Sequence, residues 1–179
     1  IKDYNKMITM NLKEIDNLVL VIGKTEGHID QSLFARTILD EKNGPPPEIN
    51  LFNEKNNGES LLDLIDKNYI KSAHDISLGG LITALSKMCI QGNKGIKLNK
   101  SKNLINEIEY FFAEDQGRYL IEINPKDFDE VTNILNKNSV HYEKLGNIIE
   151  KEMIINDKTK VTIDELKSYN TNWLINFMS

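Results

Sequence analysis

The sequence is poor in the residues that mark several protein classes, with one cysteine, one tryptophan and four prolines in 179 residues. A single cysteine excludes an internal disulfide framework, and no His/Cys cluster has the spacing of zinc ligands. No apolar run is long enough to span a bilayer, and we expect neither a membrane contact nor a signal peptide. With 22 basic against 27 acidic residues, the chain has no basic excess for nucleic acid.

The remaining composition is that of one globular domain. Hydrophobic residues make up 40% of the chain, and its length is sufficient to bury a core. The chain begins at Ile1 rather than at a methionine. We therefore expect residues 1–16 to be a linker or the tail of a preceding domain, followed by one domain over residues 17–179.

A strand, a polar turn and a helix are predicted in the middle of the chain. Residues 69–73 read as a short buried strand and residues 74–77 as a turn. Gly79 and Gly80 allow the following helix to start close to a neighbouring element. Gly92 is available as its left-handed C-cap. The helical spacing predicts one apolar stripe made of Leu81, Ala84, Leu85, Met88 and Cys89.

The start of this helix admits two interpretations. Backbone N–H groups at a helix N-terminus after a glycine-containing turn suit a phosphate or another anion. Alternatively, the side chains of Asp75 and Ser77 cap the helix by accepting hydrogen bonds from those N–H groups. From these residues alone, we favour capping.

Strands and helices alternate along the rest of the chain. The predicted strands are 17–23, 69–73, 95–99, 117–123, 142–149, 153–155 and 160–163. Further helices are predicted at 50–68, broken near Gly58, and at 164–178, with Leu166, Trp173, Leu174 and Phe177 packed inward. Gly146 predicts a bulge. This pattern predicts an α/β (α+β) fold, a layered mixed sheet covered by helices with partial ferredoxin-like topology.

The densest set of polar groups is the run from Glu114 to Arg118. In one interpretation Arg118 pairs with a carboxylate while Gln116 and Gly117 form a turn. In the other, the run is a ligand clamp in which Arg118 takes a phosphate bidentately. The local sequence favours neither.

Four segments together resemble a known family. They are the run Ala-His-Asp-Ile-Ser-Leu-Gly-Gly-Leu at 73–81, the run Phe-Ala-Glu-Asp-Gln-Gly-Arg-Tyr-Leu at 112–120, the loop 23–33 and the Gly-Pro-Pro-Pro segment at 44–47. They resemble the C-terminal AIR-synthase-like domain of the second repeat of the phosphoribosylformylglycinamidine synthase large (synthetase) subunit. The proline segment and the run at 114–118 favour this ligase over AIR synthetase, selenophosphate synthetase and thiamine monophosphate kinase, which share the fold.

The resemblance implies an ATP-dependent C–N ligase of the cytoplasm. Such an enzyme converts formylglycinamide ribonucleotide and glutamine-derived ammonia to formylglycinamidine ribonucleotide in purine synthesis, with ATP and Mg²⁺. The implied partners are the N-terminal domains of the same enzyme, a glutaminase subunit and a small carrier subunit. The candidate substrate- or nucleotide-binding residues are His28, His74, Ser77, Gly79, Gly80, Glu114, Asp115, Gln116 and Arg118, with Asp75 as a candidate magnesium ligand. No catalytic residue is assigned.

A non-catalytic interpretation also stands. The second repeat of this family is often not the catalytic one, and Asp115 replaces a small serine of the family pattern. The chain would then be a structural half of a pseudo-dimer of two repeats. In either case we expect the isolated chain to be inactive, because it has no Walker-type glycine loop with its lysine.

Overall fold

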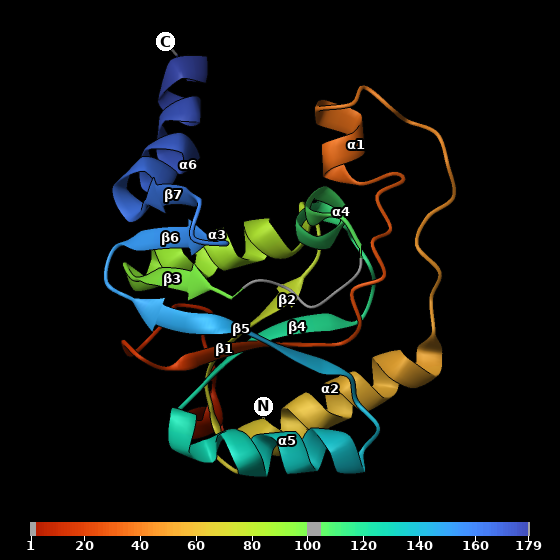
Figure 1. Cartoon of the computed structure of the whole chain (residues 1–179), viewed down its shortest axis with the longest axis vertical. Coiled ribbons are helices and arrows are strands. Elements are labelled where there is room, and N and C mark those ends of the chain that lie inside the picture. Colours follow the sequence, from red (N-terminus) through yellow and green to blue (C-terminus); the bar gives the residue numbers. More distant parts are fainter. Residues whose placement is uncertain (1–2, 100–104, 179) are drawn as a thin grey trace.

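A computed structural model describes residues 3–99 and 105–178 of the chain. Within them, seven strands form one mixed sheet in the order β2-β4-β1-β5-β3-β6-β7 (Figure 1). The strands are β1 (Leu18–Ile22), β2 (Ile70–Ile76), β3 (Gly95–Leu98), β4 (Arg118–Ile123), β5 (Tyr142–Ile149), β6 (Glu152–Ile155) and β7 (Thr159–Thr162). The helices are α1 (Leu33–Thr37), α2 (Leu51–Asp66), α3 (Gly80–Gly92), α4 (Glu107–Phe112), α5 (Phe128–Lys137) and α6 (Ile163–Met178). Short 3₁₀ turns lie at Tyr4–Lys6 and Pro125–Asp127.

The apolar strand β1 occupies the middle of the sheet. All five of its residues are buried, and it pairs antiparallel with both β4 and β5. Strands β4 and β5 therefore run parallel to each other on either side of β1, and α5 connects them. This is the split βαβ arrangement of ferredoxin-like folds, and the predicted layered fold is confirmed.

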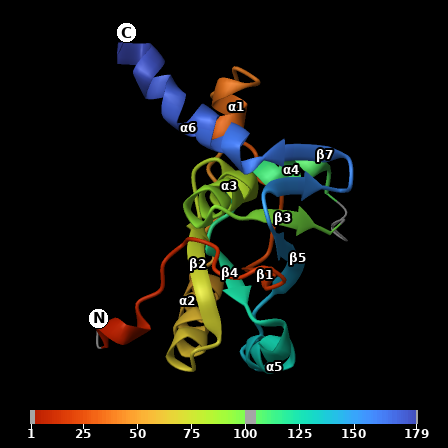
Figure 2. The ribbon, with the colours of Figure 1, turned by 90° about the vertical axis from the view of Figure 1, so that its left-hand side faces the viewer.

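Helices cover the two faces of the sheet and enclose two apolar clusters. On one face, Leu64 of α2 and Leu135 of α5 pack against β1 and β4. On the other, α3, α4 and the first turn of α6 pack against the sheet, with Met88 and Phe111 among the buried side chains. The two views in Figures 1 and 2 show α2 and α5 at one end and α1 and α6 at the other.

Most of the predicted elements are confirmed. The bulge lies at Gly146, since Val19 pairs with Gly146 and the next residue, Leu20, pairs with Lys144. Cys89 is fully buried, and burial raises the pKa of its thiol to about 12. The predicted break in the 50–68 helix is wrong: α2 is continuous through Gly58, because its anchor Leu64 is buried in the sheet and a single helical glycine costs only about 1 kcal/mol.

The predicted turn and caps around α3 are also wrong. Strand β2 continues through Ile76, because residues 70–76 pair along β4. The N-cap of α3 is Gly79 in a left-handed conformation, and neither Asp75 nor Ser77 caps the helix. The left-handed C-cap is Asn93, whereas Gly92 lies inside the helix where a Cβ would meet the Leu12 backbone at 2.5 Å.

A buried carboxylate attaches the segment before β1 to the sheet. Glu122 is fully buried and accepts hydrogen bonds from the backbone N–H groups of Lys13 and Glu14 and from the side chains of Asn17 and Ser72, at 2.7–3.0 Å. Leu12 also lies in the core. The segment expected to be a linker is thus partly packed on the domain, and the boundary after residue 16 stays a prediction.

Gly80 is the point of closest approach between α3 and α4. A Cβ at Gly80 would lie 2.7–2.8 Å from backbone atoms of Phe111, Phe112 and Ala113, and its φ is +70°. This confirms the expectation that the glycine permits a tight contact. We predict that Gly80→Ala lowers the free energy of unfolding by about 1–3 kcal/mol, because backbone atoms cannot give way.

Gly58 provides the matched control. It lies inside α2, and a Cβ there would have only the Tyr119 hydroxyl within 4 Å, at 3.8 Å. Gly58→Ala should raise the free energy of unfolding by about 0.5–1 kcal/mol, since alanine is the better helix former. Urea denaturation of both variants tests the pair. Equal effects of the two substitutions would contradict the close approach at Gly80.

Candidate functional site

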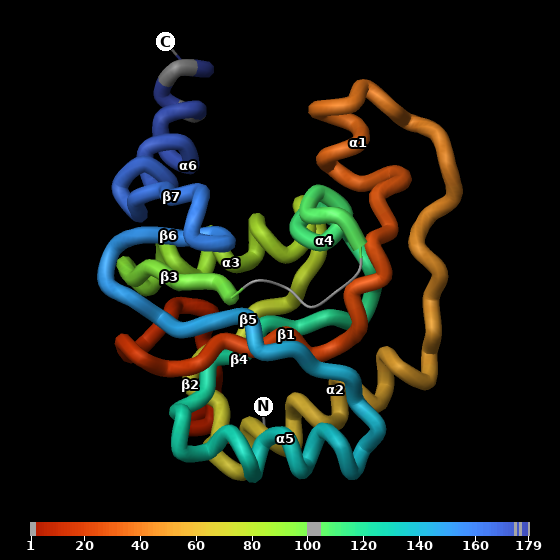
Figure 3. Tube along the Cα trace, in the orientation of Figure 1, coloured from red at the N-terminus to blue at the C-terminus, as the bar shows by residue number. Residues whose placement is uncertain are grey.

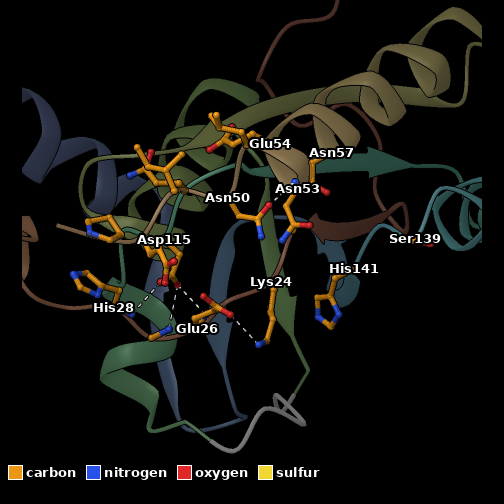
Figure 4. Close-up of a pocket in the computed structure, with 17 residues that line it drawn as sticks. Lys24, Glu26, His28, Asn50, Asn53, Glu54, Asn57, Asp115, Ser139 and His141 are labelled. Atoms are coloured by element: carbon orange, nitrogen blue, oxygen red, sulfur yellow. Dashed lines mark hydrogen bonds and ion pairs between the residues drawn. The ribbon is translucent and has the colours of Figure 1, made fainter. Parts of the chain in front are cut away.

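A polar cavity of about 1000 Å³ lies between the loop after β1 and the first turns of α2 (Figure 4). Its walls come from segments far apart in the sequence: the loop that follows β1, the start of α2, the turn before β4 and the entry to β5. The lining residues are Gly23, Lys24, Glu26, Gly27, His28, Pro47, Glu48, Ile49, Asn50, Leu51, Asn53, Glu54, Asn57, Asp115, Gln116, Ser139 and His141.

Asp115 fixes the floor of this cavity. Its Oδ2 accepts hydrogen bonds from the backbone N–H groups of Glu26 and Gly27, at 2.9 and 3.1 Å, and its Oδ1 accepts one from His28 at 3.0 Å. The carboxylate is 7% exposed. Three backbone donors therefore converge on one carboxylate, which holds the loop in a single shape.

Arg118 supports Asp115 from the interior. Its guanidinium donates to the carbonyl oxygens of Ala113 and Asp115 and to the hydroxyl of Thr25, at 2.6–3.2 Å. One of its nitrogens also lies 3.9 Å from Oδ2 of Asp115. Burial lowers the pKa of Arg118, and the nearby Asp115 charge partly offsets that effect. Its donors are directed at protein groups and it does not line the cavity.

Glu114 joins two helix N-termini. Its Oε1 accepts hydrogen bonds from the N–H of Gly79, the N-cap of α3, at 2.8 Å and from the N–H of Leu33, the first residue of α1, at 2.7 Å. A carboxylate is stabilised by the partial positive charge of a helix N-terminus. At the start of α3, where the sequence favoured capping and left an anion as the alternative, the N–H of Gly79 thus meets a carboxylate of the protein itself.

An extended segment between α1 and α2 closes one side of the cavity. It runs along the outside of the molecule before reaching α2 (Figure 3). His28 Nε2 lies 2.9 Å from the Pro45 carbonyl oxygen, so this nitrogen carries the proton. Gln31 donates to the carbonyl oxygens of Lys42 and Gly44 at 2.8 and 3.1 Å. The loop that Asp115 holds therefore also anchors this segment, named here the strap (residues 38–50).

The opposite wall is the polar face of α2. Asn50, Asn53 and Asn57 are spaced at helical intervals, and Glu54 lies beside them (Figure 4). The Asn57 side chain donates to the carbonyl oxygen of Gly117 at 2.9 Å, which ties α2 to the turn before β4. Amides at this spacing offer donors and acceptors to hydroxyl, amide or phosphate groups of a ligand.

The charged side chains that line the cavity are mostly acidic, since four carboxylates, those of Glu26, Glu48, Glu54 and Asp115, accompany a single lysine, Lys24. Lys24 and Glu26 form an exposed ion pair at 2.9 Å, and the hydrogen bond to Glu26 raises the pKa of Lys24. His141 approaches from the entry to β5 (Figure 4). The cavity therefore combines neutral amides with an excess of carboxylates, and one lysine is its cationic side chain.

The structure does not bring the predicted site residues together in one place. Of the candidates, His28, Asp115 and Gln116 line the cavity. Glu114, Gly79 and Gly80 meet at the start of α3, and Arg118 lies behind Asp115. The ligand roles proposed for these residues stay predictions.

A second, more apolar groove of about 920 Å³ contains His74 and Asp75, beside Tyr119 on β4. Asp75 Oδ1 lies 3.1 Å from His74 Nδ1, and the Asp75 side chain is 63% exposed. Burial, followed by the Glu54 and Asp75 charges, raises the pKa of Tyr119. Ser77, in the turn after β2, is exposed.

The amides of α2 and His141 were missed by reasoning from the sequence. The spacing of Asn50, Asn53 and Asn57 was an available signal, since it places three amides on one helical face. No local pattern marks His141, which reaches the cavity only because β5 pairs with β1.

We predict that Asp115→Ala lowers the free energy of unfolding by about 2–5 kcal/mol, because it leaves three backbone donors without their acceptor and removes the carboxylate charge beside the buried Arg118 guanidinium. The neighbouring Gln116→Ala should change it by less than about 0.5 kcal/mol, since that side chain is exposed. Thermal and urea unfolding of the two variants provide the measurement. An Asp115→Ala variant as stable as the parent would refute the role given to this carboxylate.

Comparisons with known proteins agree with this geometry. Residues 14–157 match the family model "AIR synthase related protein, C-terminal domain". The chain is 67% identical over 178 residues to the phosphoribosylformylglycinamidine synthase subunit PurL of Pelagibacter ubique, covering 99% of this chain and 24% of that protein. It is 34% identical over 176 residues to PurL of Bartonella henselae, covering 98% and 24%. The chain thus spans about a quarter of the length of these relatives, and its resemblance to PurL is confirmed.

Solved structures show the same fold at low sequence identity. The T. maritima PurL complexed with FGAR aligns with a TM-score of 0.73 and 18% identity, covering 91% of this chain and 30% of that one. E. coli HypE, a hydrogenase maturation protein, aligns with a TM-score of 0.63 and 15% identity, covering 87% and 52%. On the evidence of the family model, the sheet and the four motifs, the chain belongs to the AIR synthase related proteins, as their C-terminal domain.

Proposed function

We propose that this chain is a domain of an ATP-dependent C–N ligase. The reaction is the conversion of formylglycinamide ribonucleotide and ammonia, drawn from glutamine, to formylglycinamidine ribonucleotide in de novo purine synthesis. The observation that carries the proposal is the polar cavity floored by Asp115, in a chain 67% identical to a PurL subunit. The relative described as complexed with FGAR has the same fold.

The residues of the cavity divide into contact and positioning groups. Gln116 and the amides of Asn50 and Asn53 are the proposed ligand contacts, because they line the cavity and can both donate and accept. Asp115 and Arg118 are positioning residues, since their hydrogen bonds go to backbone groups that shape the floor. We therefore propose that Arg118 contributes to the ligand clamp indirectly, by holding Asp115 in place.

The proposed cofactors of the whole enzyme are ATP and Mg²⁺. Bound ATP supplies the phosphoryl group that turns an amide oxygen into a leaving group, and Mg²⁺ neutralises the phosphate charge. Asp75 fits as one oxygen ligand, because Mg²⁺ is usually held by one or two carboxylates together with phosphates and waters. Among the described residues no cluster of three metal-binding side chains occurs, so Asp75 would act with groups from the nucleotide or another domain.

The proposed partners are the other domains of the same enzyme, a glutaminase subunit and a small carrier subunit. A solved relative is described as PurLQS from Thermotoga maritima, an assembly whose PurL has this fold. We place the enzyme in the cytoplasm, as a purine-synthesis ligase. No helix among the described residues has the length and apolar character to cross a membrane.

A second candidate function is that of a structural half, in which this repeat shapes the enzyme without binding substrate. Three charged residues that the sequence offered as ligand contacts favour this function, because Glu114, Asp115 and Arg118 all form hydrogen bonds with groups of the protein. The two functions predict different behaviour of Gln116, whose side chain is exposed toward the cavity.

We predict that Gln116→Ala in the full-length enzyme lowers kcat/KM for amidine formation by about tenfold or more, because one or two ligand hydrogen bonds are lost. Gln91→Ala, an exposed glutamine at the end of α3 and outside the cavity, is the control and should leave the rate unchanged. Steady-state assays with ammonia, ATP and Mg²⁺ measure both. Unchanged kinetics for Gln116→Ala would favour the structural half.

The isolated 179-residue chain should show no ligase or ATPase activity. Phosphoryl transfer depends on several cationic and metal-binding groups around ATP, and the described cavity has one lysine. ADP release and amidine formation are measured with the purified chain, ammonia, Mg²⁺, ATP and formylglycinamide ribonucleotide. Turnover above that of a heat-treated sample would show that the catalytic groups lie within this chain.

A further inference from the structure

The outer half of α6 carries an apolar face that the domain does not cover. The first turn is anchored: Ile163 is 1% exposed, and Leu166 packs against the core. Trp173 and Phe177 follow on the same face at helical spacing, but they are 61% and 81% exposed. The inward packing predicted from the sequence is therefore confirmed for Leu166 and wrong for Trp173 and Phe177, while the Leu174 side chain lies outside the described residues. The face continues past the end of the domain core.

The helix projects away from the body of the molecule. Figures 1 and 2 both show its C-terminal end beyond the sheet and α3. A capping pair between Thr162 and Glu165 and a hydrogen bond from Lys167 to Asn93 hold its beginning. In the described part of the chain, the side-chain hydrogen bonds farther along run within the helix, from Thr171 to Lys167 and from Asn172 to Ser168.

Such a helix end is unfavourable in isolation. Isolated helices shorter than about 12–15 residues are marginal in water, and α6 has 16 residues of which only the first turns are packed. Trp173 and Phe177 stack with ring centroids 6.4 Å apart, which presents a continuous aromatic surface to solvent. Exposed aromatic patches of this kind mark contact surfaces.

The polar residues of the outer half indicate a protein rather than a lipid partner. Residues 168–179 contain no charged side chain, and their polar residues are serine, threonine and asparagine. Helices that lie on membranes carry lysine and arginine on the polar face, which this segment lacks. Aromatic residues with few charges are typical of the core of a protein–protein interface.

The length of the curated relatives indicates what could cover this face of α6. This chain covers 24% of their length, so most of the polypeptide in these relatives lies outside the described structure. A second apolar pair, Ile38 and Leu39 after α1, is 68% and 47% exposed. Helix α1, which directly precedes this pair, lies at the same end of the molecule as α6 (Figure 1). A neighbouring domain seated at this end would cover both patches.

We propose that Trp173 and Phe177 form the docking surface of this domain for another domain of the same polypeptide. The surface is distinct from the polar cavity, because none of its residues lines that cavity. The docking proposal can therefore fail or succeed independently of the ligand site proposed above.

The test uses the purified full-length polypeptide without other subunits, at a concentration where sedimentation velocity shows a monomer. Amide hydrogen exchange is followed for residues 168–178. We expect these amides to be protected from exchange in the parent protein. In the double variant Trp173→Lys/Phe177→Lys they should exchange at least about tenfold faster, because buried aromatic residues contribute strongly to the stability of an interface. Ile175→Lys is the matched control, because Ile175 is 66% exposed and lies on the opposite face of the same helix. It should keep the protection.

Four results would overturn the proposal. Unprotected amides in the parent monomer would show that nothing in the polypeptide covers the face. Protection that appears only at concentrations where dimers form would assign the face to a second copy. Protection that appears only after addition of another subunit or of lipid vesicles would assign it to that partner. An equal loss of amide protection in Ile175→Lys would mean that a lysine on either face of the helix unfolds it, which also contradicts a face-specific contact.

Discussion

The candidate site depends on the hydrogen-bonded unit formed by Asp115 and Arg118. Arg118 donates to the backbone carbonyl groups of Ala113 and Asp115, and the Asp115 carboxylate in turn accepts three N–H groups of the loop after β1. Both residues are almost fully buried, so removal of either leaves the other without compensation. The shape of the cavity floor is therefore coupled to the start of β4.

Carboxylates perform the same task at three places in this domain. Asp115 binds the loop after β1, Glu114 binds the N-termini of α1 and α3, and Glu122 binds the segment before β1. Asp115 and Glu122 are buried, and the backbone N–H groups that they accept would otherwise lack partners away from water. These contacts are non-local, and they attach irregular segments to a sheet whose own strands are apolar.

This use of carboxylates decides what remains available to a ligand. The helix start that could have bound an anion is occupied by Glu114, and the guanidinium that could have bound a phosphate is directed inward. The polar groups that remain available include the amides of α2 and Gln116, together with Lys24 and the carboxylates of Glu26, Glu48 and Glu54. Because carboxylates outnumber the single lysine, any phosphate charge of a ligand would have to be met by Lys24 or by other domains.

The sequence alone determined the elements and the family. Strand β1, the apolar stripe of α3 with Cys89, the Gly146 bulge and the β6–β7 hairpin follow from local periodicity and turn residues. The order of the four motifs was sufficient for the resemblance, because the residues of each motif are contiguous in the chain.

Only the tertiary structure decided which polar groups face the cavity and which apolar ones face solvent. The internal contacts of Asp115, Arg118 and Glu114 could not be read from the sequence, because their partners lie up to 93 residues away along the chain. Helical spacing predicted that Trp173 and Phe177 share a face with Leu166, but it could not show that α6 extends beyond the core of the domain. Periodicity defines the faces of an element, whereas the extent of its neighbours determines how much of each face is buried.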